Sequence, residues 1–182
     1  ITGTVNRIAE SSFKECRKLQ YVEIDEGVSS IGFNAFINCI SLKSINLPST
    51  INNIEARGFD GCTGELIINC NVPDAKDSQS SPFYWSDFSS IVVGDHVEIL
   101  GDYVFCNNWR KKNLRKVSLG RNIRKLGKYA FSESPSSTPP DRDKRKATLN
   151  LTKSKSGKRY ASSHKESRKR WRVLFLYRVS AP

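Results

Sequence analysis

The sequence predicts a repeat solenoid of short parallel strands over residues 1–133, followed by a disordered basic tail over residues 134–182. Two observations predict this fold class. A phenylalanine recurs about every 23 residues, and most of these phenylalanines are followed by a segment in which apolar and polar residues alternate. A unit of this length cannot bury its own apolar face, so such units stack on one another. We therefore expect a right-handed superhelix of five to six units, joined by irregular or short-helical return segments.

Each unit begins with two apolar positions, which lie eight and five residues before its phenylalanine. The unit of Phe83 alone lacks both. The phenylalanines are Phe13, Phe36, Phe59, Phe83, Phe105 and Phe131; the two positions hold Val5 and Ile8, Val28 and Ile31, Ile51 and Ile54, Val97 and Leu100, and Ile123 and Leu126. This recurrence assigns the same inward-facing places to successive turns of the solenoid.

A short strand follows the phenylalanine in each unit. The positions nine and eleven residues after it are apolar and alternate with polar residues, which is the period of a strand with one buried face. They hold Val22 and Ile24, Ile45 and Leu47, and Ile68 and Cys70. Parallel strands of successive units are expected to lie about 4.8 Å apart.

Two segments interrupt the repeat. Residues 71–82 consist mainly of turn-forming and polar residues, which predicts a surface loop ahead of a strand at residues 91–93. Extra residues between Phe105 and Val117 are expected to bulge outward with Trp109. No capping unit is evident at either end of the repeats, so Val5 and Phe131 are expected at exposed edges.

The spacing I8-x4-F13-x2-C16-x2-L19-x2-V22-x-I24 repeats at residues 31–47. It resembles the BspA-like leucine-rich repeat of surface proteins from bacteria and some protists, and the resemblance covers residues 1 to about 133. The segments CTGELIINCNVPDA and FYWSDFSSIVVGD also resemble an irregular unit that recurs within such arrays. The resemblance implies a leucine-rich-repeat solenoid that serves as an extracellular or cell-surface adhesion or host-interaction module.

Positive charge is concentrated in the tail. The whole chain has a formal net charge of +12, but the basic and acidic residues before residue 141 nearly balance. The tail is therefore open to three interpretations: binding of nucleic acid or another polyanion by counterion release, solvated disorder, or sequence unshaped by selection. Asn150 begins a match to a glycosylation acceptor. No apolar stretch reaches the roughly 20 residues of a membrane helix, so no transmembrane segment is predicted.

The residue types required for catalysis or metal binding do not form a convincing pattern. Cys16, Cys39 and Cys62 occupy one slot of successive units, and Cys70 falls in an inward strand slot, which favours buried, reduced thiols. The alternatives are an occasional disulfide and a free thiol at Cys106. His96, with Asp95 and Glu98 beside it, is more simply explained as part of a solvated turn. We predict no catalytic residue, no metal, no cofactor and no small-molecule substrate.

The side chains that point outward from the strands are the candidate partner-binding residues. They fall into two columns, one with Glu23, Asn46, Asn69, Val92 and Ser118, and one with Tyr21, Ser44, Ile67, Ser90 and Lys116. Five strands with roughly 10 Å of exposed length give a face of about 240 Å². A stable interface needs roughly 800 Å² per partner, so tight binding would require more repeats or multivalency.

Charged residues differ between the two ends of the array. Glu23, Asp25 and Glu26 near the first strand are best explained as a solvated face. The later units carry a candidate basic patch: Arg110, Lys111, Lys112, Arg115, Arg121, Arg124 and Lys125. The sequence thus predicts a non-enzymatic module that binds an extracellular or host protein; the alternative is polyanion or nucleic-acid binding through the tail and this patch.

Overall fold

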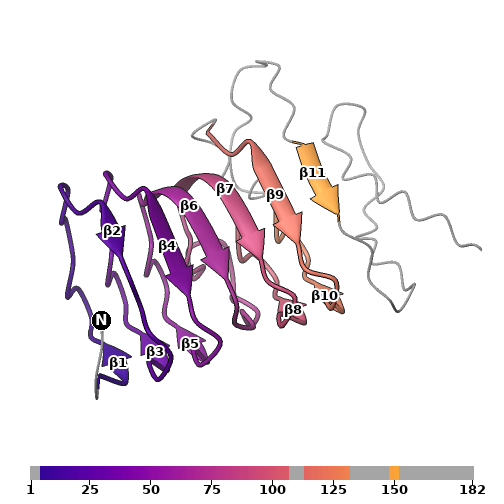
Figure 1. Cartoon of the computed structure of the whole chain (residues 1–182), viewed down its shortest axis with the longest axis horizontal. Coiled ribbons are helices and arrows are strands. Elements are labelled where there is room, and N and C mark those ends of the chain that lie inside the picture. The colour runs from indigo at the N-terminus through magenta and orange to yellow at the C-terminus, as the bar shows by residue number, and fades with distance from the viewer. Residues whose placement is uncertain (1–4, 107–112, 132–147, 152–182) are drawn as a thin grey trace, which may run out of the picture.

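The chain winds into a parallel β-solenoid of about five turns (Figure 1). The computed structural model describes residues 5–106, 113–131 and 148–151, and no helix occurs among them. Each turn passes through a long strand, a short strand and a turn segment that contains the phenylalanine. We refer to the turn segments (residues 9–19, 32–42, 55–62, 82–86, 101–106 and 127–131) together as the turn side.

Six parallel strands form the long-strand sheet in the order β11-β9-β7-β6-β4-β2. Each long strand therefore lies beside the long strand of the adjacent unit. The strands are β2 (Tyr21–Val22), β4 (Ser44–Leu47), β6 (Thr63–Ile68), β7 (Asp87–Val93), β9 (Lys116–Leu119) and β11 (Thr148–Leu151). Alternate side chains of β4, β6, β7 and β9 enter the core, as the strand period predicts.

The short strands form two separate sheets. The first contains β1 (Arg7–Ile8), β3 (Ser30–Ile31) and β5 (Asn53–Ile54), and the second contains β8 (Ile99–Leu100) and β10 (Lys125–Leu126). Directly after β5, the Glu55 N–H donates to the carbonyl of Ile31 at 2.8 Å. In the next unit Val72 bridges to Leu100, and Pro73 takes the place that corresponds to Glu55. Proline has no N–H, so the ladder stops at β5.

A continuous stack of phenylalanine rings runs through the core beneath the turn side. The centroid distances between successive rings are 5.0, 5.3, 5.5, 4.9 and 4.8 Å from Phe13 through Phe131. Backbone hydrogen bonds hold each ring in register with the next unit; Phe36 N–H donates to the Gly58 carbonyl and Phe105 N–H to the Ala130 carbonyl, both at 2.8 Å. The stack confirms the predicted repeat.

The third unit reaches its long strand sooner after Phe59 than the spacing of the first two units predicts. That spacing aligns Ile68 and Cys70 with Ile45 and Leu47, whereas the structure pairs Ile45 with Leu66 and Leu47 with Ile68. The cause is Gly64, with a φ of +85°, where a Cβ would lie 2.4 Å from the Leu42 carbonyl oxygen. Because only glycine permits this close approach, the chain enters β6 two residues early.

The segment at residues 71–82 is not simply a surface loop, as its composition predicts. Val72 is buried and takes the inward place of the short strand, while Ser78 and Ser81 are also buried. The Ser81 hydroxyl donates to the carbonyl of Val104 in the next unit. Apart from Pro73 and Ala75, the residues of the segment that reach the surface are polar, so the prediction of a surface loop holds for only part of it.

The two ends of the array differ. Val5 is 43% exposed, as predicted, and Phe131 is half-buried against Phe105. The sequence pattern ends the solenoid at residue 133, but β11 continues the long-strand sheet by pairing in parallel with β9. Those four residues therefore depart from the prediction of a disordered tail. The expected bulge around Trp109 and the rest of the tail lie outside the described residues.

The phenylalanine stack predicts a position-dependent cost of truncation. Phe59 is fully buried between two rings, whereas Phe13 is partly buried and contacts one ring among the described residues. We expect Phe59→Ala to lower the free energy of unfolding by about 3–5 kcal/mol and Phe13→Ala by clearly less. Urea denaturation followed by circular dichroism measures both; equal losses for the two variants would contradict a stack that is strongest at its centre.

Candidate partner-binding surface

The outward side chains of the long-strand sheet form two columns. The first contains Tyr21, Ser44, Glu65, Ser90 and Lys116, and the second contains Asn46, Ile67, Val92 and Ser118. Tyr21 is 64% exposed, and Asn46 and Lys116 are also exposed. Glu23 is exposed but follows the end of β2. Most of the residues predicted to point outward therefore lie in these two columns, and their role in partner binding stays a prediction.

Two members of the predicted columns are misplaced. Asn69, predicted in the second column, follows the end of β6, and Ile67, predicted in the first column, occupies the place expected for Asn69. Glu65 then takes the place predicted for Ile67. The early entry into β6 at Gly64 causes this shift. The signal in the sequence is Glu65 itself, which stands where the two preceding units have Leu19 and Leu42.

The corrected register brings two β-branched apolar side chains together on the outward face. Ile67 of β6 pairs directly with Val92 of β7, and both are half-buried. Directly paired side chains on neighbouring strands lie within contact distance. Asn46 and Ser118 lie beyond them in the same column. The centre of the face is therefore apolar and its margins are polar, which is the arrangement of many protein interfaces.

Polar side chains beside this apolar centre bond to one another. Asn69 Nδ2 donates to Asn46 Oδ1 at 3.0 Å, and the Ser90 hydroxyl donates to a Glu65 carboxylate oxygen at 3.1 Å. At the first strand, the Lys43 ammonium lies 5.2 Å from the centroid of the Tyr21 ring. These contacts fix the side chains in place, which lowers the entropic cost of binding to a face of this kind.

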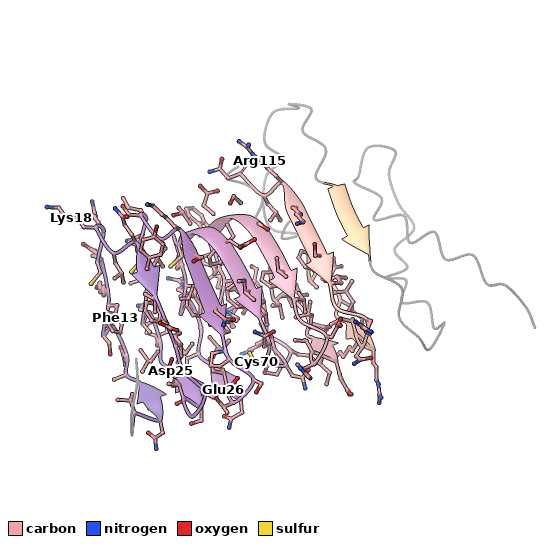
Figure 2. All side chains as sticks on the ribbon, in the orientation of Figure 1. Phe13, Lys18, Asp25, Glu26, Cys70 and Arg115 are labelled. Carbon is pink, nitrogen blue, oxygen red and sulfur yellow. The ribbon has the colours of Figure 1, made fainter. Side chains whose placement is uncertain are left out.

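The predicted basic patch is largely neutralised where the structure describes it. Arg121 Nε lies 2.6 Å from Asp95 and Arg124 lies 3.6 Å from Glu98. Arg110, Lys111 and Lys112 are outside the described residues. Arg115, near the start of β9, is exposed (Figure 2). Sequence reasoning missed the ion pairs because each joins residues of different units.

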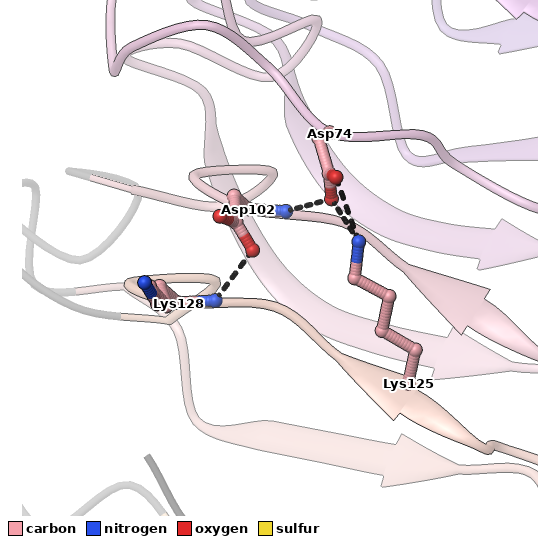
Figure 3. Close-up of polar contacts among 4 residues, drawn as sticks. All are labelled: Asp74, Asp102, Lys125 and Lys128. Carbon is pink, nitrogen blue, oxygen red and sulfur yellow. Dashed lines mark hydrogen bonds and ion pairs between the residues drawn. The ribbon is translucent and has the colours of Figure 1, made fainter. Parts of the chain in front are cut away.

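Lys125, another residue of the predicted basic patch, forms an ion pair with Asp74 (Figure 3). The Asp74 carboxylate accepts hydrogen bonds from the Lys125 ammonium at 2.6 Å and from the Asp102 N–H at 2.8 Å. Asp102 in turn accepts the Lys128 N–H at 2.7 Å. The Lys125 ammonium and then the Asp102 N–H lower the pKa of Asp74 from 3.8. Three successive units are thereby linked along this edge.

Carboxylates elsewhere play the same linking role at the ends of the long strands. Glu26 accepts the N–H groups of Ser49 and Thr50, each at 3.1 Å, and the Ser49 N–H lowers its pKa most. The Arg121 N–H likewise lowers the pKa of Asp95. Glu26, with Asp25 near it at the strand ends (Figure 2), therefore joins two units in addition to facing solvent.

All five cysteines are free thiols. Cys39, Cys62, Cys70 and Cys106 are buried and Cys16 is half-buried, so the prediction of reduced, mostly buried thiols is confirmed. The Cys62 thiol donates to the carbonyl of Phe36 at 3.0 Å. Burial raises the pKa of Cys70 to about 12. These thiols pack the core, although Cys70 does so just after β6 and not within it.

The described residues show no constellation suited to metal binding. No group of three or more His, Cys, Asp or Glu side chains gathers there. His96 is exposed at a turn, where Asp95 pairs with Arg121 and Glu98 with Arg124. The same residues form no helix that is long and apolar enough to cross a bilayer.

One cavity lies at the edge where the short-strand ladder is interrupted. Its volume is about 350 Å³, and it opens between residues 49–52 on one side and Asn71, Pro73 and Ile99 on the other. It arises because the fourth unit passes from Ile68 to Val72 in fewer residues than its neighbours use. The sequence gives no direct signal of this cavity beyond the missing apolar positions ahead of Phe83.

Comparison with known proteins identifies one family. The model described as BspA type leucine rich repeat region matches residues 1–109 and 76–140, with six copies. No curated protein and no solved structure matches the chain. The family model covers the predicted repeat array and agrees with the resemblance carried by the spacing of Ile8, Phe13 and Cys16.

The Asp74 ion pair makes a pH-dependent contribution to stability. Because its pKa is lower in the folded protein than the ordinary 3.8, the contribution is complete above pH 3.8 and disappears as the pH falls through the folded-state pKa. Both partners are about half exposed, so we expect Asp74→Asn to cost about 0.5–1 kcal/mol at neutral pH.

Denaturant unfolding at neutral and strongly acidic pH tests this prediction. The difference between the wild type and Asp74→Asn should disappear at the acidic pH. Glu10→Gln provides a matched control, since Glu10 is exposed and its side chain forms no hydrogen bond or ion pair with another described residue. A difference that persists unchanged in acid would mean that the Asp74 carboxylate does not stabilise the fold through its charge.

Proposed function

The chain belongs to the BspA-type leucine-rich-repeat family, and on that basis we propose that it is a non-enzymatic adhesion module that binds an extracellular or host protein. The binding residues are those of the outward face of the long-strand sheet. Families of leucine-rich repeats typically bind proteins and are typically non-catalytic, and this family is commonly associated with cell surfaces. The proposed location is accordingly the cell surface or the extracellular space.

The observation that carries the proposal is the pairing of Ile67 with Val92 on the outward face. Two adjacent β-branched side chains that remain partly exposed are available for burial by a partner. Ser44, Asn46, Ser90 and Ser118 surround them in the two columns. An apolar centre with a polar margin excludes water when a partner covers it, and such central residues supply most of the affinity of an interface.

The alternative of polyanion binding through the predicted patch has less support. Arg121, Arg124 and Lys125 each pair with a carboxylate, so their charges are already compensated within the fold. Release of counterions from a nucleic acid or sulfated polymer requires uncompensated positive charge. We therefore propose the protein partner as the primary ligand of the solenoid.

The area of the face limits the affinity of a single copy. Six strands spaced by about 4.8 Å with roughly 10 Å of outward length provide about 290 Å². Even doubled by flanking turns, this remains below the roughly 800 Å² per partner of a stable interface. We propose that useful affinity comes from several copies of the module acting together on one surface.

A photo-crosslinking experiment with the full chain tests this function. With benzoylphenylalanine at position 92, irradiation in the presence of solubilised cell-surface proteins should yield a discrete cross-linked protein, which is then purified. The same group at Lys18, exposed on the turn side, should not capture it. We expect Ile67→Asp to weaken binding of that purified protein at least about tenfold, since it places a charge in the apolar centre.

Matched variants and salt separate the possible outcomes. Asn46→Ser at the margin should retain most of the binding, and the thermal unfolding of Ile67→Asp should stay close to that of the wild type because the side chain is only half-buried. Binding should survive moderate salt, whereas binding of heparin, a sulfated polymer, should decline steeply. Equal binding by wild type and Ile67→Asp would refute the proposed face.

A further inference from the structure

The turn side carries an exposed tryptophan at a place where other units have small or polar residues. Two residues after the phenylalanine, successive units have Glu15, Asn38, Gly61 and Trp85, and all four adopt a left-handed conformation with φ between 55° and 72°. Asparagine and glycine tolerate this conformation best, although the bulky residues Arg57, Tyr103 and Tyr129 adopt it two residues before their phenylalanines. Among the described residues, Trp85 is the one aromatic residue two positions after a phenylalanine.

Trp85 contributes little to the core. It is 46% exposed, whereas Phe83, two residues earlier, is fully buried in the phenylalanine stack. The Trp85 carbonyl accepts the Gly61 N–H at 3.3 Å, a backbone contact that any residue at position 85 can make. An aromatic ring that is held in a left-handed conformation and remains exposed is a candidate for a functional role.

Neighbouring side chains complete a small aromatic and polar surface. The Tyr84 and Trp85 rings lie 5.7 Å apart with an interplanar angle of 38°, and the Arg57 guanidinium lies 5.1 Å from the centroid of Tyr84. In the preceding unit, Gly61 contributes no side chain beside Trp85. Asn38 reaches over that glycine, since a Cβ on Gly61 would lie 2.6 Å from Asn38 Oδ1.

The size of this surface favours a small ligand over a protein. A tryptophan has roughly 250 Å² of surface, so the exposed part of Trp85 corresponds to about 115 Å². Tyr84 and Arg57 are only half-exposed and add less. The total is well below even the roughly 290 Å² of the long-strand face, and it is enough to cover one face of a sugar ring.

We propose that Trp85, Tyr84, Arg57 and Asn38 form a carbohydrate-binding site on the turn side, separate from the protein-binding face of the long-strand sheet. The apolar face of a pyranose packs on the Trp85 ring. Arg57 donates hydrogen bonds to its hydroxyls, and the Asn38 amide both donates and accepts. The Arg57 guanidinium lies over the Tyr84 ring, and this cation–π contact holds Arg57 at the margin of the aromatic surface. The ligand is a neutral saccharide.

Saturation-transfer NMR with the full chain tests the site. The probes are methyl α-D-mannopyranoside, methyl β-D-galactopyranoside and N,N′-diacetylchitobiose at millimolar concentrations, as a ligand of this size warrants. At least one should receive magnetisation, most strongly at the protons of one ring face. Trp85→Asn should weaken its binding about tenfold without lowering the melting temperature, because asparagine suits the left-handed conformation.

Two further variants distinguish this site from the proposed protein-binding face. Ile67→Asp, on the long-strand sheet, should leave saccharide binding unchanged. Arg57→Lys should weaken saccharide binding without removing the magnetisation transfer that depends on Trp85. The proposal is overturned if none of the three saccharides shows transfer that depends on Trp85. It is also overturned if Trp85→Asn instead abolishes capture of the protein that cross-links at position 92.

Discussion

The stacking of one phenylalanine per turn is the constraint on which the rest of the structure depends. Successive rings lie 4.8–5.5 Å apart from Phe13 to Phe131, which matches the spacing of parallel strands. The number of residues between phenylalanines varies, yet the ring spacing hardly changes. Additional or missing residues are therefore accommodated between the rings, where they cause the early entry into β6 at Gly64 and the cavity near Pro73.

The sequence predicts the fold well because the features that define it are local and repeated. The phenylalanine period, the apolar positions before it and the aligned cysteines each follow from counting along the chain. Counting fails at Asn69 because the close approach of Gly64 to the Leu42 carbonyl is a contact between units. The ion pair of Asp74 with Lys125 is missed for the same reason, as its partners are 51 residues apart.

These between-unit contacts change the functional interpretation more than they change the fold. The shift at β6 replaces an amide by Ile67 in the outward column, which converts a mixed polar face into one with an apolar centre. Of the basic-patch residues that the structure describes, Arg121, Arg124 and Lys125 form ion pairs and Arg115 does not. Under the proposed function, binding to the long-strand face is driven mainly by burial of apolar surface and not by charge.

Disulfide trapping measures most directly whether Ile67 and Val92 are neighbours on the recognition face. Cα atoms of directly paired parallel strands lie about 4.8 Å apart, within the range that a disulfide bridges. With Ile67→Cys and Val92→Cys combined, mild oxidation should join the two positions rapidly, as peptide mapping by mass spectrometry would show. The combination of Asn69→Cys with Val92→Cys should remain reduced. Preferential bridging of the Asn69 pair would contradict the register and the apolar centre built on it.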